Sequence, residues 1–170
     1  MGTVGSMDDE RVAELIADLT QRGLTLATAE SLTGGGLVAR LVDVPGASHV
    51  VRGGACTYAV DTKASVLGVS ESQLALTGPV DEQVALQMAR GARALFRADI
   101  GVSTTGVAGP GPADGFPAGT VHVACAHPAG EEHRLLHLDG ERAAVRAGAI
   151  DAAIALVRDV LDFAGAQVGD

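Results

Sequence analysis

Aromatic side chains are scarce in this sequence: three Phe, one Tyr and no Trp make up 2% of its 170 residues. Hydrophobic residues nevertheless account for 47%, which is enough for one folded domain of this length. The core must therefore consist of Ala, Val, Leu and Ile packed in thin layers, because few large rings are present to fill wide gaps.

Long apolar runs and an export signal are missing too. No stretch approaches the roughly 20 residues of a membrane helix, and residues 1–7 lack the basic and apolar regions of a signal peptide. We expect residues 1–7 to be a tail or a cloning remnant, and residues 8–165 to form a single domain. The two cysteines, Cys56 and Cys125, lie in apolar runs and are expected in the core. Without a disulfide framework, the reducing cytoplasm is the expected compartment.

Positive charge is in deficit. Twelve Lys and Arg against 21 Asp and Glu give a net charge of −9. This balance argues against a nucleic-acid-binding surface and against an anionic membrane surface. A small anionic ligand needs only a local positive site, so a small-molecule partner remains open, as does assembly into a homo-oligomer.

Lysine is the scarcest cation: the chain has eleven Arg but one Lys, Lys63, five residues after its only tyrosine, Tyr58. Arginine keeps its proton in proteins, whereas a desolvated lysine can accept one. Two interpretations stay open at this point. Either codon bias left one lysine in the chain by chance, or Lys63 is present because it accepts a proton.

The order of elements predicts an α/β fold with a mixed sheet between helical layers. Gly53 and Gly54 indicate a bulge or a close backbone approach within one strand. The expected helices and strands are placed by apolar periodicity, caps and breakers. Helices are predicted over residues 8–22, 37–42, 63–67, 81–96 and 141–163, and strands over 24–29, 50–58, 100–105, 120–126 and 133–138, the last two as an antiparallel hairpin.

Three segments are expected to meet at the carboxyl ends of the strands, where such folds bind ligands: 31–36, 58–63 and 104–111. Ser31 precedes a glycine run and a helix start, whose free N–H groups can hold an oxyanion or a phosphate. The segment matches neither a P-loop nor a Gly-x-Ser-x-Gly elbow. The plainer alternative is that Ser31 or Thr33 only caps the helix.

A nucleophilic serine needs a base, and the five histidines lack an obvious acidic partner. His133 and His137 fall in a predicted strand, so their spacing does not predict a metal site. Lys63 is the better candidate if burial and the helix start beside Ser31 lower the pKa of its amine. Tyr58 could hydrogen-bond the amine or the hydroxyl, or be an ordinary strand residue. We expect no metal and no organic cofactor.

A second possible ligand region is the Gly- and Pro-rich loop 106–119, whose only charge is Asp114. Its backbone N–H groups could line a substrate, although most such loops are surface connections. Arg142 and Arg146 lie one helical turn apart and could bind an anion together, although solvated helix surface is the commoner outcome.

Several motifs resemble, in order and spacing, the CinA C-terminal domain family, which contains the nicotinamide mononucleotide (NMN) deamidases. The resemblance covers about residues 8–163. The motifs are Thr28-Ala29-Glu30-Ser31-Leu32-Thr33-Gly34-Gly35, Thr57-Tyr58 with Lys63, Thr105-Gly106-Val107-Ala108-Gly109-Pro110, Pro117-Ala118-Gly119-Thr120-Val121, and Gly140-Glu141-Arg142 with Arg146. The loop after Pro110 is short for the family.

The resemblance implies a three-layer α/β/α sandwich with a mixed, mostly parallel sheet. It also implies hydrolysis of the carboxamide of NMN to nicotinic acid mononucleotide and ammonia, a step of pyridine nucleotide (NAD) recycling. It carries the roles of nucleophile, base and supporting hydroxyl onto Ser31, Lys63 and Tyr58. The substrate-binding residues expected are Glu30, Thr33, Gly34, Gly35, Thr105, Gly106, Ala108, Gly109, Arg142 and Arg146.

The resulting hypothesis is an amidohydrolase in which neutral Lys63 deprotonates Ser31 and N–H groups near residues 33–35 hold the oxyanion. Two alternatives remain. One is an amidase or esterase that acts on another small substrate with the same residues. The other is a non-catalytic nucleotide-binding regulatory domain, which would bind such a nucleotide without turnover.

Overall fold

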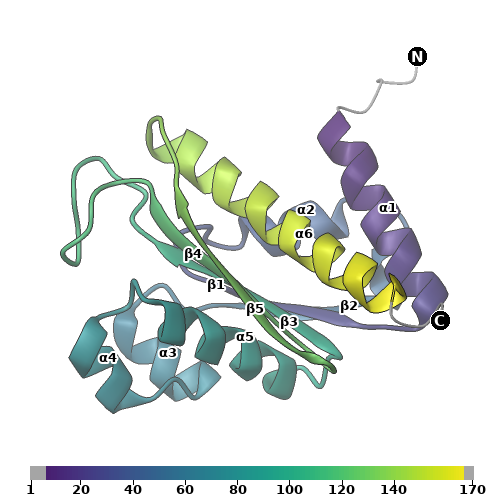
Figure 1. Cartoon of the computed structure of the whole chain (residues 1–170), viewed down its shortest axis with the longest axis horizontal. Helices are drawn as coiled ribbons and strands as arrows, with labels where there is room; N and C mark the ends of the chain where they lie inside the picture. The colour runs from purple at the N-terminus through teal and green to yellow at the C-terminus, as the bar shows by residue number, and fades with distance from the viewer. Residues whose placement is uncertain (1–6, 167–170) are drawn as a thin grey trace.

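A computed structural model describes residues 7–166 as a five-stranded sheet between two helical layers (Figure 1). Residues 1–6 of the expected tail lie outside the described part, and Met7 already belongs to the first helix. The helices are α1 (Met7–Arg22), α2 (Gly36–Val42), α3 (Val60–Leu67), α4 (Glu71–Thr77), α5 (Glu82–Leu95) and α6 (Arg142–Ala166), with a 3-10 turn, η1 (Ala47–His49). The strands are β1 (Leu26–Glu30), β2 (Val51–Cys56), β3 (Ile100–Gly106), β4 (Thr120–His127) and β5 (Gly130–His137).

The strand order is β2-β1-β3-β4-β5, and it combines two kinds of pairing. β1 pairs in parallel with β2 and with β3, while β3–β4 and β4–β5 are antiparallel. The mixed sheet is therefore confirmed, with parallel and antiparallel pairings in equal number. Because β1, β2 and β3 run in the same direction, their carboxyl ends meet at one edge of the sheet.

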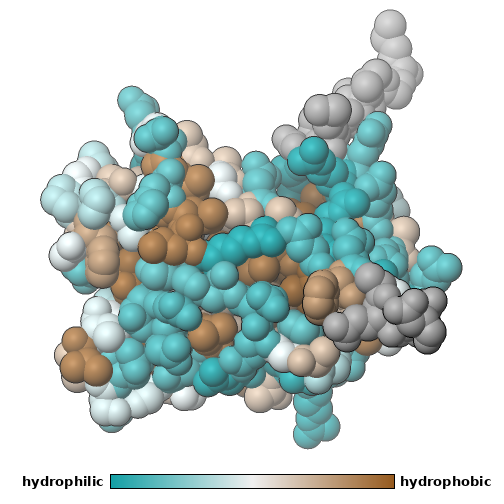
Figure 2. All heavy atoms as spheres, viewed as in Figure 1, coloured by the Kyte–Doolittle hydropathy of each residue, from teal (hydrophilic) through white to brown (hydrophobic). Residues whose placement is uncertain are grey.

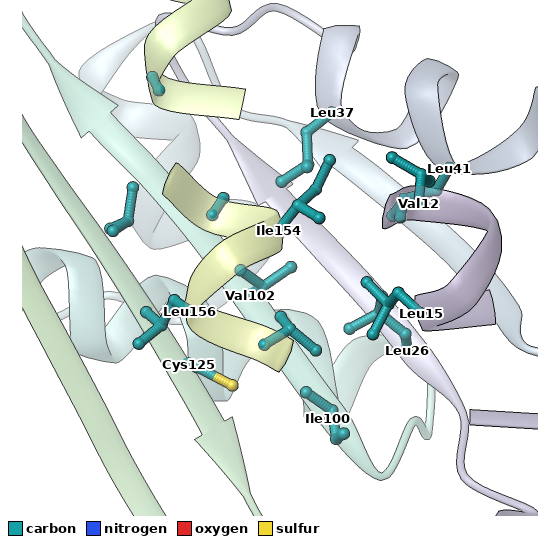
Figure 3. Packing of buried hydrophobic residues seen from close by; sticks show 14 of the residues in the cluster. Val12, Leu15, Leu26, Leu37, Leu41, Ile100, Val102, Cys125, Ile154 and Leu156 are labelled. Atoms are coloured by element: carbon teal, nitrogen blue, oxygen red, sulfur yellow. The ribbon is translucent and has the colours of Figure 1, made fainter. Parts of the chain in front are cut away.

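One core lies between the sheet and the layer formed by α1, α2 and α6. Figure 3 shows side chains of this cluster: Leu156 of α6 lies near Cys125 of β4, Ile154 of α6 near Val102 of β3, and Leu15 of α1 near Leu26 of β1. The cluster consists almost wholly of Val, Leu, Ile and Ala, as the composition predicts. These aliphatic contacts hold α6 across the sheet. Its first residue, Arg142, lies at the edge where β1, β2 and β3 end.

The opposite core is thinner because small residues line it. Ala27 and Ala29 of β1 pack against α5, and a Cβ on Gly101 would stand 2.0 Å from the carbonyl oxygen of Ala89. The α5 backbone therefore lies almost directly on β3. Of the aromatic residues, only Phe96 packs against this core, whereas Tyr58 is exposed. The expectation of an aliphatic core in thin layers is confirmed.

Cys56 and residues 71–77 differ from the prediction. Cys56 is exposed, not in the core, because β2 is an edge strand whose alternate residues face solvent. The helix α4 was missed, although Ser70 caps it by accepting a hydrogen bond from the N–H of Gln73, and Ser-x-x-Gln is a capping-box spacing. The glycine expectation is confirmed: a Cβ on Gly54 would approach Thr28 Oγ1 to 2.3 Å.

The surface seen from the same side carries apolar residues in separate patches among hydrophilic ones (Figure 2). Within residues 7–166, no helix combines the length and the apolar character needed to cross a bilayer.

Replacement of Gly91 tests the contact that holds α3 on α5. A Cβ at Gly91 would lie 2.1 Å from the carbonyl oxygen of Leu67, the last residue of α3. We expect Gly91→Ala to lower the free energy of unfolding by about 1–3 kcal/mol, although alanine is the better helix former. Urea titration followed by circular dichroism measures the loss.

The matched control is Gly165→Ala, also in a helix, where the added Cβ would meet only Arg22 at an ordinary 3.6 Å. This control should lose no stability. Equal stability of Gly91→Ala and the parent protein would show that α3 can move away from α5 without loss.

Candidate active site

A cleft of about 290 Å³ opens at the edge where β1, β2 and β3 end. Its walls come from the turn after β1, the start of α3, the loop between β3 and β4, and the first residue of α6. In Figure 1 these segments lie at the end of the molecule where the long β3–β4 loop projects. The three segments predicted to converge, 31–36, 58–63 and 104–111, all contribute residues to this cleft.

Ser31 and Lys63 lie in contact on the floor of the cleft. The Nζ atom of Lys63 is 3.0 Å from Ser31 Oγ and 2.5 Å from the carbonyl oxygen of Thr57, which accepts a hydrogen bond from it. Lys63 is fully buried, and Ser31 is 8% exposed. The contact joins the turn after β1 to helix α3, so it depends on the tertiary fold and not on local sequence.

Burial disfavours the charged form of the amine and lowers the pKa of Lys63 from 10.5 to about 8. Cys56 when ionised and the Asp114 carboxylate act in the opposite direction and raise the pKa of Lys63, with a smaller effect. Burial also raises the pKa of the Cys56 thiol, so at neutral pH the negative charge comes from Asp114. At pH 7, about one amine in ten is therefore neutral and able to accept a proton. This is the electrostatic property that a general base in this position requires.

Glu30, the last residue of β1, holds the turn that presents Ser31. Its carboxylate is 1% exposed and accepts hydrogen bonds from the hydroxyls of Thr28 and Thr33. It also accepts from three backbone N–H groups at the start of α2, those of Gly35, Leu37 and Val38. A buried side-chain carboxylate thus occupies the amino end of this helix, where negative charge is favourable.

This arrangement engages two of the three residues expected to supply oxyanion-binding N–H groups, namely Gly34 and Gly35 but not Thr33. The N–H of Gly35 donates to Glu30, and the N–H of Gly34 donates to the carbonyl of Ser31 at 3.1 Å. Neither group is free for an oxyanion. Among the described backbone groups, the N–H groups of Leu32, Ala108 and Gly109, three residues of the cleft wall, carry no hydrogen bond.

Arg146 of α6 holds the same turn from the other side. Its Nε–H and Nη2–H groups donate to the carbonyl oxygens of Leu32 at 2.9 Å and Thr33 at 3.0 Å. Because both groups face the chain and Arg146 does not line the cleft, it is not placed to share an anion with Arg142. Arg142 and Arg146 therefore do not form the expected anion-binding pair.

Arg142 stands at the mouth of the cleft. It donates to the carbonyl of Gly109 at 2.6 Å and to the Tyr58 hydroxyl at 3.1 Å. Tyr58 is 63% exposed and has no hydrogen bond to Ser31 or Lys63 among those of the described residues. Tyr58 is therefore part of the rim, tied through Arg142 to the β3–β4 loop.

The predicted site residues divide into two groups. Those that line the cleft are Ser31, Tyr58, Lys63, Thr105, Gly106, Ala108, Gly109 and Arg142. Those that lie behind it and support the Ser31 turn are Glu30, Thr33, Gly34, Gly35 and Arg146. In this structure these five residues are not placed to touch a substrate in the cleft.

The Thr57 carbonyl and the wall residues Pro79 and Val80 were not predicted. No sequence signal identifies a backbone carbonyl as a partner of lysine.

Other hollows lack comparable chemistry. A larger one of about 490 Å³, between α1 and α6, is lined mainly by charged surface residues and contains no serine, cysteine or lysine. Over residues 7–166, no group of three or more His, Cys, Asp or Glu side chains is placed to hold a metal ion.

The Glu30 contacts predict a large effect of a small substitution. Glu30→Gln keeps the size but replaces one acceptor oxygen with an NH₂ group that faces N–H donors. We expect a loss of about 2–4 kcal/mol in the free energy of unfolding, measured by urea titration. The control Glu71→Gln, at an exposed acid in the first turn of α4, should change stability by less than about 0.5 kcal/mol. A similar small change in both variants would contradict the role given to Glu30.

Comparison with known proteins gives one consistent result. The family model of the CinA C-terminal domain matches residues 8–161. A CinA-like protein of Frankia casuarinae is 46% identical over 160 residues, which cover 94% of this chain and 37% of that protein. The chain spans between 37% and 39% of the length of three such relatives.

Solved structures agree with the sequence match. Competence/damage inducible protein CihA from Agrobacterium tumefaciens superposes with a TM-score of 0.87 at 36% identity, covering 95% of this chain and 99% of that chain. A competence-damaged protein (CinA) superfamily protein from Klebsiella pneumoniae gives a TM-score of 0.89 at 33% identity, covering 93% and 99%. By sequence and by structure, the chain belongs to the CinA C-terminal domain family.

Proposed function

We propose that this chain is a Ser/Lys amidohydrolase that converts NMN to nicotinic acid mononucleotide and ammonia. The observation that carries the proposal is the 3.0 Å contact between Lys63 Nζ and Ser31 Oγ on the floor of a cleft. A buried amine with a pKa of about 8, held against a serine hydroxyl, is a combination that suits nucleophilic catalysis.

In the first step, neutral Lys63 accepts the Ser31 proton while Ser31 Oγ attacks the carboxamide carbon. The Thr57 carbonyl anchors the amine by accepting one of its hydrogens, and the lone pair of the neutral amine accepts the Ser31 proton across the 3.0 Å contact. The unpaired N–H groups of Leu32, Ala108 and Gly109 in the cleft wall are the candidate donors to the oxyanion. Donors fixed by the fold stabilise this charge without reorganisation.

In the second step, the ammonium of Lys63 gives its proton to the leaving nitrogen, and ammonia departs as the C–N bond breaks. Water then attacks the acyl-enzyme and passes a proton to Lys63, and the Ser31 hydroxyl is restored as the acid leaves. Every proton is carried by Ser31, Lys63, water or the product. These reaction steps use no metal ion and no organic cofactor.

The choice of NMN comes from the family resemblance, and the cleft fits it in outline. The cleft presents an exposed guanidinium, Arg142, at the mouth and the Ser31 hydroxyl at the floor. A nucleotide with its carboxamide inward would place its phosphate towards Arg142, since arginine pairs well with phosphate oxygens. We place this activity in pyridine nucleotide recycling in the cytoplasm.

The direct test is ammonia release from NMN by the purified protein treated with a chelator. We expect Ser31→Ala and Lys63→Arg each to lower kcat by at least about 10³-fold, because one lacks the nucleophile and the other keeps the charge but cannot act as base. A coupled ammonia assay measures the rate, and liquid chromatography identifies the acid product.

The matched control is Arg134→Lys, a change of cation on β5 that lies outside the cleft and should leave kcat within about twofold. Parent-like turnover in Lys63→Arg would rule out the base role. Turnover of other amides but not of NMN would favour the alternative substrate class. Binding without turnover would favour the regulatory domain.

The pH dependence follows from the lysine. The base is active when neutral, so kcat/KM should rise about tenfold per pH unit below the pKa of about 8 and level off above it. Initial rates from pH 6 to 9.5 at constant ionic strength measure the profile. A profile that levels off near pH 6.5 would point to a histidine instead.

A further inference from the structure

Asp114 is the single acidic residue that lines the cleft, among the residues that the structure describes. The other ionisable side chains of the wall are Lys63 at the floor and Arg142 and Tyr58 at the mouth. Without Asp114, the charge facing a ligand would be wholly positive. A carboxylate in this position therefore changes which ligands the cleft accepts.

A tight turn fixes the position of Asp114. Ala113 and Phe116 exchange two backbone hydrogen bonds, at 3.0 and 2.9 Å, and the two residues between them have positive φ angles. Asp114 has φ of 52° and Gly115 has φ of 84°. This is a two-residue hairpin turn of the kind that Asp-Gly and Asn-Gly both favour. The turn accounts for a short polar residue at Asp114, but asparagine would serve it as well, so the turn does not account for the charge.

The charge of Asp114 reaches the reacting groups. Its carboxylate raises the pKa of Lys63, against the larger lowering by burial. A carboxylate that acts on the floor of the cleft also acts on a ligand lying between the two. Its attraction for a cation, and its repulsion of an anion, therefore act on a ligand held in the cleft.

We propose that Asp114 makes the cleft selective for carboxamides on a cationic ring, as the counter-charge to a pyridinium. This inference rests on the proposed function, because it takes the ligand to be an NMN-like nucleotide with its carboxamide at Ser31. The ring cation then faces Asp114 while the phosphate at the far end faces Arg142. Asp114 and Arg142 thus carry charges opposite to those of the ring and of the phosphate.

The test compares NMN with its 1,4-dihydro form, which keeps the carboxamide, ribose and phosphate but has a neutral ring. Binding is measured by calorimetry in the Ser31→Ala background, so that turnover does not enter. We expect NMN to bind more tightly than the dihydro form. Asp114→Asn should weaken NMN binding about threefold to tenfold and leave the dihydro form within twofold. The loss of NMN affinity caused by Asp114→Asn should be smaller at 1 M salt, because salt screens the charge.

The matched control is Asp43→Asn, which removes an exposed carboxylate at the end of α2, away from the cleft. It changes the net charge by the same amount and should alter neither dissociation constant. Asp114→Asn preserves a favoured turn dipeptide, so its thermal midpoint should stay within about 2 °C. Unfolding of this variant would contradict the turn geometry on which the inference depends.

Equal weakening of both ligands by Asp114→Asn would overturn the inference, because it would assign Asp114 to the ribose hydroxyls. So would an unchanged NMN affinity.

The two proposals fail separately. Ammonia release from NMN with no ring-charge preference removes only the inference, whereas a ring-charge preference without turnover in the Ser31-containing protein removes only the catalytic proposal. Failure of both ligands to bind overturns the substrate assignment and the inference together.

The pH dependence of kcat/KM in the Ser31-containing enzyme gives a second test, because the charge of Asp114 acts on the Lys63 amine. Asp114→Asn removes a charge that raises the pKa of Lys63, so the rising limb of kcat/KM against pH should move to lower pH. A purely structural role of the turn would leave the limb where it is.

Discussion

The buried carboxylate of Glu30 is the interaction on which the site depends most. It receives hydrogen bonds from two threonine hydroxyls and three backbone N–H groups, and it joins the end of β1 to the start of α2. Ser31 lies directly after Glu30, so its position is fixed by a network whose carboxylate does not line the cleft. The guanidinium of Arg146 closes this network from α6. Satisfying so many donors with one carboxylate makes the turn rigid, because each partner loses a buried hydrogen bond if the turn moves.

Lys63 depends on this rigidity and on the thinness of the second core. Helix α3 carries the amine, and α3 is held by its close approach to α5, with Gly91 under the Leu67 carbonyl. The amine then meets two fixed oxygens, one from Ser31 and one from the Thr57 carbonyl. A bulkier core would move α3 outward and separate the lysine from the serine. The scarcity of aromatic residues in the sequence is thus linked to the geometry of the site.

Much of this arrangement could be predicted from the sequence, and the reasons for the failures are physical. The strands and most helices follow from apolar periodicity, and the meeting of residues 31, 58 and 63 follows from parallel strands ending at one edge. The sequence could not assign Glu30 and Arg146 to the scaffold, because a polar residue in a motif has the same pattern whether it faces inward or outward. The exposure of Cys56 depends on β2 being an edge strand, which only the strand order reveals. The partner of Lys63 is a main-chain carbonyl, which leaves no trace in side-chain identity.

Tyr58 has a consequence that lies outside catalysis. The chain contains no tryptophan and no second tyrosine, and this one ring stands at the mouth of the cleft, held by Arg142. Its emission is therefore the intrinsic tyrosine fluorescence of the whole protein, and its source is located at a single known point. Occupation of the cleft that disturbs the Arg142 contact or covers the ring changes that signal directly. The protein thus carries a built-in optical reporter of ligand entry, and no label needs to be attached.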